Sequence, residues 1–115
     1  MNERGGTVSG TRAGGFVTVA KVGEIPPGGV KVVRLDDQEI AVYNLAGNYY
    51  AMDDVCTHDG GPLAEGVIDG NVIECPRHGA RFDIRSGAVL AMPATVPVPI
   101  YAVRVDGDDI QVGWS

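Results

Sequence analysis

The sequence predicts a small all-β domain, an antiparallel sandwich or barrel with extra hairpins inserted between Asp53 and Leu90. Two observations favour this fold class. The 115 residues include 17 Gly and 7 Pro, which is typical of short strands joined by many turns. Helical periodicity of 3.6 residues is absent from the sequence, whereas β-branched and aromatic residues gather in short runs between the turns.

Each predicted strand is bounded by residues that favour turns. A segment rich in Pro and Gly at 25–29 follows the first strand, after a short helical turn expected at 22–26. The first strands are expected at 16–22, 30–35 and 40–45. The hairpin turns that follow are expected at Gly47-Asn48, Asp69-Gly70, Ser86-Gly87 and Asp106-Gly107-Asp108.

Residues 1–15 are expected to form a flexible leader, and residues 16–115 a single domain. The leader contains five Gly and has no apolar segment of the kind found in signal peptides. Apolar runs in the chain fall well short of the ~20 residues needed to cross a bilayer. We therefore expect a cytoplasmic protein. Its formal net charge of −6 argues against nucleic acid and anionic membranes as partners.

All cysteines and histidines of the chain lie in two short groups, at 56–58 and 75–78. Sixteen residues separate the groups, and the hairpin expected within that gap would fold the second group back beside the first. Glycines next to both groups allow the main chain to wrap closely around a bound anion. The four candidate ligands are Cys56, His58, Cys75 and His78.

The residue types alone leave the bound group open. Two Cys and two His can bind zinc tetrahedrally, although zinc modules usually space their ligand pairs differently. A catalytic Cys–His pair is a further alternative, and it leaves the second Cys and the second His unexplained.

At these positions the chain resembles the Rieske family, whose signature is Cys-x-His, then, after about sixteen residues, Cys-x-x-His. The resemblance extends over about residues 16–112. It implies the Rieske fold, with cluster-binding loops within about 53–94 and one 2Fe–2S cluster. Further segments that resemble the family are Leu63-Ala64-Glu65-Gly66, Val72-Ile73-Glu74-Cys75-Pro76, Phe82-Asp83, Ser86-Gly87 and Pro93-Ala94.

The resemblance also implies ligand roles. Cys56 and Cys75 would bind one iron as thiolates, and His58 and His78 the other iron through neutral imidazoles.

The short chain is similar to the ferredoxin components of bacterial aromatic-ring-hydroxylating dioxygenase systems. Such a protein is not an enzyme and has no catalytic residues of its own. It would carry one electron from a flavin-containing NAD(P)H-dependent reductase to a terminal oxygenase, in the breakdown of aromatic hydrocarbons. Two alternatives stay open: a Rieske-like small subunit of a larger reductase of the nitrite reductase type, and a structural zinc-binding module.

Charged residues flank both groups of candidate ligands. They form either a rim that docks redox partners or a solvated surface with local ion pairs. These residues are Asp53, Asp54, Asp59, Arg77, Arg81 and Arg85.

We predict a reduction potential in the low Rieske range, nearer ~ −150 mV than +300 mV. High-potential members carry a disulfide between the loops and two hydroxyl donors to sulfur, and the matching positions here are Gly61, Arg77, Ala80 and Phe82. Hydrogen bonds to sulfur stabilise the more negative, reduced state, so their loss lowers the potential. Potentiometry of the purified protein checks this prediction, and a clearly positive midpoint contradicts it.

Overall fold

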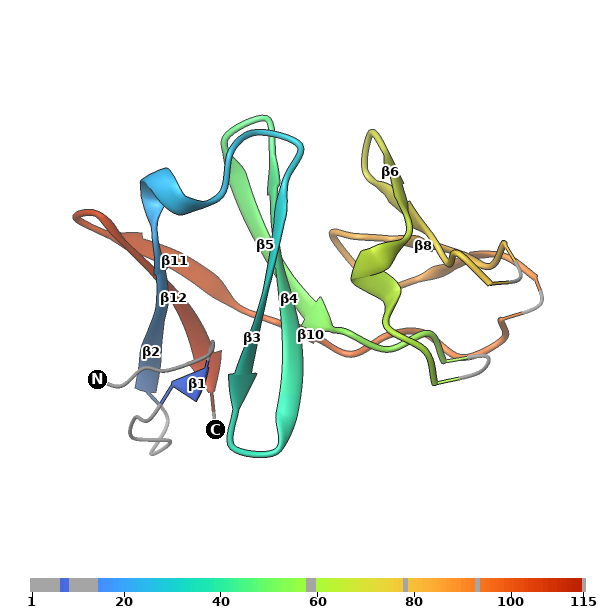
Figure 1. Ribbon diagram of the computed structural model, residues 1–115, viewed down its shortest axis with the longest axis horizontal. Helices are drawn as coiled ribbons and strands as arrows, with labels where there is room; N and C mark the ends of the chain where they lie inside the picture. Colours follow the sequence, from blue (N-terminus) through green and yellow to red (C-terminus); the bar gives the residue numbers. More distant parts are fainter. Residues whose placement is uncertain (1–6, 9–14, 58–59, 78, 93, 115) are drawn as a thin grey trace.

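The computed structural model describes residues 7–8, 15–57, 60–77, 79–92 and 94–114. It confirms the predicted all-β fold, with three sheets and two single-turn 3-10 helices in the described part (Figure 1). The large sheet has the order β1 (Thr7–Val8), β3 (Val30–Leu35), β4 (Gln38–Leu45), β5 (Asn48–Asp53), β10 (Ile100–Tyr101). The small sheet has the order β11 (Val103–Asp106), β12 (Asp109–Trp114), β2 (Gly15–Lys21). The third has the order β6 (Val67–Asp69), β7 (Val72–Glu74), β8 (Arg81–Asp83), β9 (Val89–Ala91).

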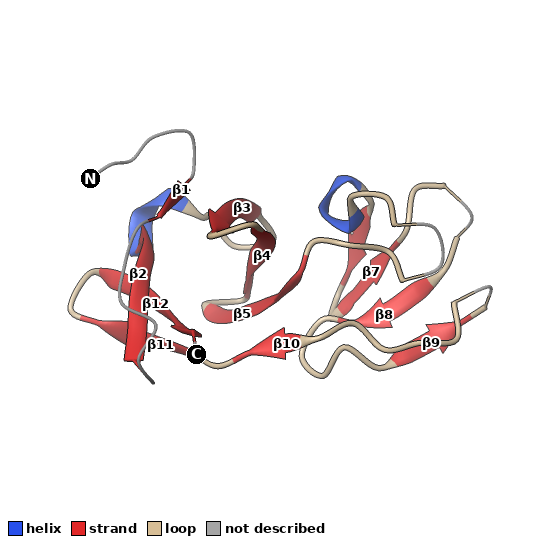
Figure 2. Cartoon of the chain, turned by 90° about the horizontal axis from the view of Figure 1, so that it is seen from below, coloured by secondary structure: helices blue, strands red, loops and turns tan. Residues whose placement is uncertain are grey.

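The large and small sheets form a sandwich, and the third sheet belongs to a subdomain beside it (Figure 2). Neighbouring strands pair antiparallel, apart from the parallel pair of β1 and β3. Helices long and apolar enough to cross a membrane are not found among the residues that the structure describes.

Strand β4 has both of its faces buried. Ile40 and Val42 point into the core that the large sheet shares with the small sheet. Ala41, Tyr43 and Leu45 point the opposite way, into the core shared with the subdomain. Successive side chains of a strand point to opposite faces, which explains why neighbouring residues of β4 lie in different cores. Burial of both faces explains why the sequence at 40–45 is apolar almost without interruption.

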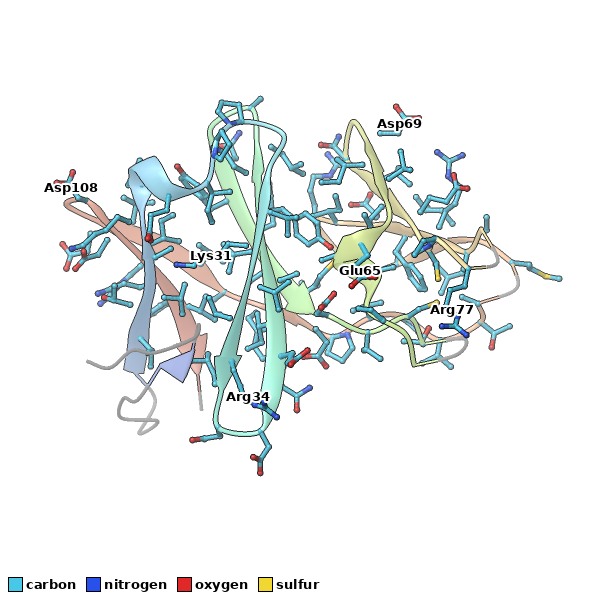
Figure 3. All side chains as sticks on the ribbon, in the orientation of Figure 1. Lys31, Arg34, Glu65, Asp69, Arg77 and Asp108 are labelled. Carbon is cyan, nitrogen blue, oxygen red and sulfur yellow. The ribbon has the colours of Figure 1, made fainter. Side chains whose placement is uncertain are left out.

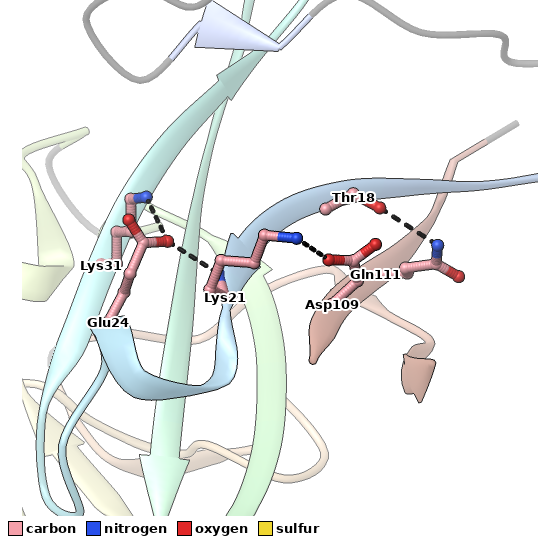
Figure 4. A network of polar contacts seen from close by, with 6 residues as sticks. All are labelled: Thr18, Lys21, Glu24, Lys31, Asp109 and Gln111. Atoms are coloured by element: carbon pink, nitrogen blue, oxygen red, sulfur yellow. Dashed lines mark hydrogen bonds and ion pairs between the residues drawn. The ribbon is translucent and has the colours of Figure 1, made fainter. Parts of the chain in front are cut away.

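The expected helical turn is confirmed as the 3-10 helix η1 (Val22–Glu24). The carboxylate of Glu24 accepts a hydrogen bond from the backbone N–H of Lys21 at 2.7 Å and one from Nζ of Lys31 at 3.2 Å (Figure 4). Lys21 also pairs with Asp109 on β12. Side chains therefore join β2, β3 and β12 at this end of the sandwich.

The hairpin turn expected at Gly47-Asn48 is wrong by one residue. Leu45 pairs with Asn48, so the turn consists of Ala46 and Gly47, both of which have positive φ. A two-residue turn that matches strand twist needs positive φ at both central positions. The glycine therefore occupies the second position of the turn and not the first.

Two residues of the expected leader form a strand. Thr7–Val8 pairs with Arg34 and Leu35 at the edge of the large sheet. Gly15, the last residue of the expected leader, begins β2, and residues 1–6 and 9–14 lie outside the described residues.

The subdomain leaves and rejoins the large sheet at neighbouring strands. It begins after Asp53 at the end of β5 and ends before β10, which pairs with β5. The backbone N–H of Asp53 donates to the carbonyl of Pro99 at 3.0 Å, and the Tyr101 hydroxyl donates to the Asp53 carboxylate. Burial, together with this hydrogen bond, raises the pKa of the Tyr101 hydroxyl. These contacts hold the two connections together.

Inside the subdomain, the second 3-10 helix, η2 (Leu63–Glu65), packs tightly against the end of β7. A Cβ atom on Gly66, which follows η2, would lie 1.8 Å from the carbonyl oxygen of Glu74. Real Cβ atoms do not approach an oxygen this closely, so the two backbones require glycine here. This approach fixes η2 beside the residue that precedes Cys75.

We predict that Gly66→Ala destabilises the protein, because the new methyl group must push η2 away from β7. The free energy of unfolding should fall by about 2–3 kcal/mol, which lowers the thermal midpoint by about 10 °C. Gly23→Ala is the matched control, since a Cβ there meets nothing within 4 Å. Thermal unfolding of both variants measures the difference, and equal midpoints would contradict the prediction.

Candidate metal centre

The two cysteines lie deep in the same core. Cys56 is 0% exposed and Cys75 is 2% exposed, and no disulfide joins them. Both belong to the core that includes Tyr43 and Met52 of the large sheet and Leu63 of η2. The structure therefore brings together the two predicted thiol ligands, which are 19 positions apart in the sequence, within one apolar environment.

The two loops that carry the cysteines have equivalent backbone hydrogen bonds. In the first loop, Cys56 N–H donates to the Gly61 carbonyl at 2.8 Å, and Gly60 N–H donates back to Cys56 at 2.7 Å. In the second loop, Cys75 N–H donates to Ala80 at 2.7 Å, and Gly79 N–H donates back to Cys75 at 3.2 Å.

Each loop also has a glycine with positive φ four residues after its cysteine: Gly60 with φ 79° and Gly79 with φ 78°. Residues with a side chain rarely adopt a positive φ, which explains why glycine occupies the same place in both loops.

The predicted histidine ligands His58 and His78 lie outside the described residues, as does Asp59. Groups of three or more His, Cys, Asp or Glu side chains suited to a metal ion are not found in the described part of the chain.

A third loop, between β9 and β10, is joined to the first. Oγ1 of Thr57, the residue after Cys56, donates a hydrogen bond to the Val96 carbonyl at 2.5 Å. Ala94 and Val98 on either side of Val96 are buried in the same core as the cysteines. The sequence gives no signal for this contact, because its partners are 39 positions apart. Pro93, which the sequence places in this loop, lies outside the described residues.

The residues at the positions where high-potential members carry hydroxyls are fully buried. Ala80 and Phe82 are both 0% exposed and share the core with the two cysteines. Their side chains have no hydrogen to donate to sulfur. The structure thus places both of these residues in the core of the two cysteines, and the low potential stays a prediction.

The acidic residues before the first loop have structural contacts. Asp53 is 7% exposed and bonds to Tyr101, so both expectations for it, a docking rim and a solvated surface, are wrong. Asp54 is half-buried and accepts a hydrogen bond from Ala64 N–H at 2.7 Å, which attaches η2 to the start of the loop. Burial raises the pKa of the Asp54 carboxyl, and the backbone donor opposes that rise.

The arginines near the second loop form local ion pairs. Arg85 lies 3.1 Å from Asp83, which lowers the pKa of that carboxyl, and Arg81 lies 3.5 Å from Asp69. Exposed pairs of this kind contribute little to stability, and they neutralise each other's charge locally. Arg77 is exposed at the end of the subdomain (Figure 3).

Comparison with known proteins assigns the family. Residues 15–102 match the family described as "Rieske [2Fe-2S] domain". The chain belongs to the Rieske 2Fe–2S family. It is 38% identical over 101 residues to the biphenyl dioxygenase ferredoxin subunit of Pseudomonas sp. (strain KKS102). The aligned region covers 87% of this chain and 93% of that protein.

Solved structures of Rieske ferredoxins have the same fold. The ferredoxin of carbazole 1,9a-dioxygenase from Nocardioides aromaticivorans IC177 matches with a TM-score of 0.83 and 36% identity, covering 87% of this chain and 98% of that one. A second match is a ferredoxin from the structure described as the complex of reduced oxygenase and oxidized ferredoxin in carbazole 1,9a-dioxygenase. It has a TM-score of 0.80 and 36% identity, and the match covers 84% of this chain and 100% of that one. This Rieske protein is accordingly a ferredoxin-type electron carrier and not a catalytic subunit.

The described donor atoms fit the Rieske group. Two buried thiols on equivalent loops are soft ligands suited to iron, and the family assignment gives this chain one Rieske 2Fe–2S cluster. The apolar core around the thiols limits access of water, which is one of the means by which proteins control a cluster's potential.

We predict that Thr57→Val loosens the third loop, because the variant keeps the shape of threonine and loses the donor to Val96. A hydrogen bond contributes about 1 kcal/mol, so hydrogen exchange of the Val98 amide should accelerate by about fivefold. Thr57→Ser keeps the hydroxyl and should exchange like the wild type. Identical exchange in all three proteins would show that the contact does not restrain the loop.

Proposed function

We propose that Cys56 and Cys75 bind one iron of the cluster, and His58 and His78 the other. The observation that carries this proposal is the pair of buried thiols on loops with the same hydrogen-bond pattern. The spacing of the histidines relative to the cysteines matches the family signature. When bound, a Rieske cluster takes up and releases one electron at a time. The chain's own contribution is to hold the ligands in place and exclude water from the cysteine side.

The ligand assignment predicts that Cys56→Ser abolishes cluster loading, because the replacement oxygen is a much harder ligand than sulfur. Iron content and the electron paramagnetic resonance spectrum after reduction measure the loss. Thr57→Ser is the matched control in the same loop and should load normally. Full loading of Cys56→Ser would contradict the assignment.

The proposed role is that of the ferredoxin in a cytoplasmic aromatic-ring-hydroxylating dioxygenase system. A flavin-containing NAD(P)H-dependent reductase would supply the electron, and a terminal oxygenase would receive it. The relatives named as ferredoxins of biphenyl and carbazole dioxygenases support this role, as does the ferredoxin solved with its oxygenase. Residues 16–115 would act as one domain in this role.

Electron delivery to a terminal oxygenase tests the role. The chemically reduced protein is mixed with the oxidised terminal oxygenase of the biphenyl system of Pseudomonas sp. (strain KKS102) or of the carbazole system of Nocardioides aromaticivorans IC177. Reoxidation of the ferredoxin together with reduction of the oxygenase supports the proposal. A loaded protein that reduces neither oxygenase and purifies in a tight complex with a larger reductase would favour the reductase-subunit alternative.

A further inference from the structure

Strand β9 and the loop that follows it carry three exposed apolar side chains within seven residues of sequence. Leu90 is 53% exposed, Met92 78% and Val96 55%. These three, which we call the apolar rim, are among only seven large hydrophobic residues that are exposed in the described part of the chain. Concentrated exposure of large apolar side chains marks an interaction site more often than single exposed residues do.

The Val96 end of the apolar rim is held beside the first cysteine loop. The Val96 carbonyl accepts the hydrogen bond from Thr57, and the buried side chains of Ala94 and Val98 anchor the chain on both sides of Val96. Val96 therefore points outward from a segment that already contributes to the core. Figure 2 shows β9, which leads into this loop, at the end of the subdomain remote from the sandwich.

Leu90 lies at an irregularity in the edge strand β9. Phe82 pairs with Val89 and Arg81 pairs with Ala91, so Leu90 has no partner in the ladder. Bulges of this type redirect side chains and are frequent beside functional sites. The exposure of Leu90 is thus built into the backbone and does not arise from poor packing.

The chain around the apolar rim is uncharged. No Lys, Arg, Asp or Glu occurs in residues 86–103, although such residues make up 21% of the sequence. Arg81 on β8 and Arg85, which follows β8, pair with Asp69 and Asp83. Arg77 is exposed at the same end of the subdomain (Figure 3). The segment that carries the apolar rim therefore offers a partner apolar side chains and no charged side chain of its own.

We propose that the apolar rim is the contact by which this ferredoxin binds the terminal oxygenase, and that the contact is apolar and not ionic. The proposal rests on the proposed function. A relative of 36% identity was solved in complex with its oxygenase, which supports this occupant over the reductase or a second copy. A small apolar contact suits a carrier that must bind briefly and leave, and the flexible Met92 side chain adapts to the partner surface.

The test uses the cluster-loaded protein and an oxygenase that accepts electrons from the wild type. The double variant Met92→Ser/Val96→Ser should bind that oxygenase about tenfold more weakly or worse, with an unchanged paramagnetic resonance spectrum. Met92→Leu keeps the apolar surface and should bind like the wild type. Val105→Ser is the matched control, since Val105 is 49% exposed on β11 in the sandwich and should not affect binding.

Salt dependence separates an apolar contact from a charged one. Wild-type affinity should change by less than about threefold between about 0.05 M and 0.5 M salt, because screening acts on charges and not on apolar contact. A fall of more than tenfold over that range would overturn the proposal in favour of a charged rim.

Other outcomes also decide. Unchanged oxygenase binding by the double variant overturns the proposal while electron delivery, and with it the proposed function, stands. If the double variant reacts more weakly with the reductase and binds the oxygenase normally, the apolar rim is the contact for the reductase. If the wild type forms a dimer that the double variant does not form, the apolar rim is the contact with a second copy. A wild type that reduces no oxygenase removes the proposed function itself.

Discussion

The structure depends on one central strand, β4, in which a run of six residues has no solvent-facing side. Residues 40–45 of β4 are buried throughout, with alternate side chains in two separate cores. One face closes the sandwich and the other supports the subdomain. The two loops that carry the cysteines are therefore stabilised by the same sheet that stabilises the rest of the protein. A substitution on β4 that exposes either face affects both cores, because the strand cannot move toward one without leaving the other.

The sequence alone predicts the fold class and locates the buried thiols, because both depend on local patterns. Hairpin turns have strong residue preferences, and metal-binding residues come in short groups with characteristic spacing. The one-residue error at Ala46 and Gly47 arises because a glycine signals a turn without specifying its position within it. The spacing of the four predicted ligands identified the family, although the two histidines lie outside the described residues.

Contacts between distant segments could not be predicted from the sequence. Aspartate is usually found at the protein surface, yet Asp53 is buried beside Tyr101 at the base of the subdomain. The bond from Thr57 to Val96 joins two loops whose proximity follows only from the folded sheets. Both contacts stabilise the region around the thiols, so the residues that support a metal centre are harder to recognise than the residues that bind the metal.

The proximity of Asp53 and Pro99 has a consequence for how this fold can be rearranged. Both connections of the subdomain leave from adjacent antiparallel strands, and the backbone hydrogen bond from Asp53 to Pro99 joins them. A segment whose two ends are neighbours can be exchanged as a unit with little cost in loop closure. Residues 54–99 are thus a natural cassette for building chimaeras, in which the electron-carrying half of one ferredoxin is grafted onto the sandwich of another.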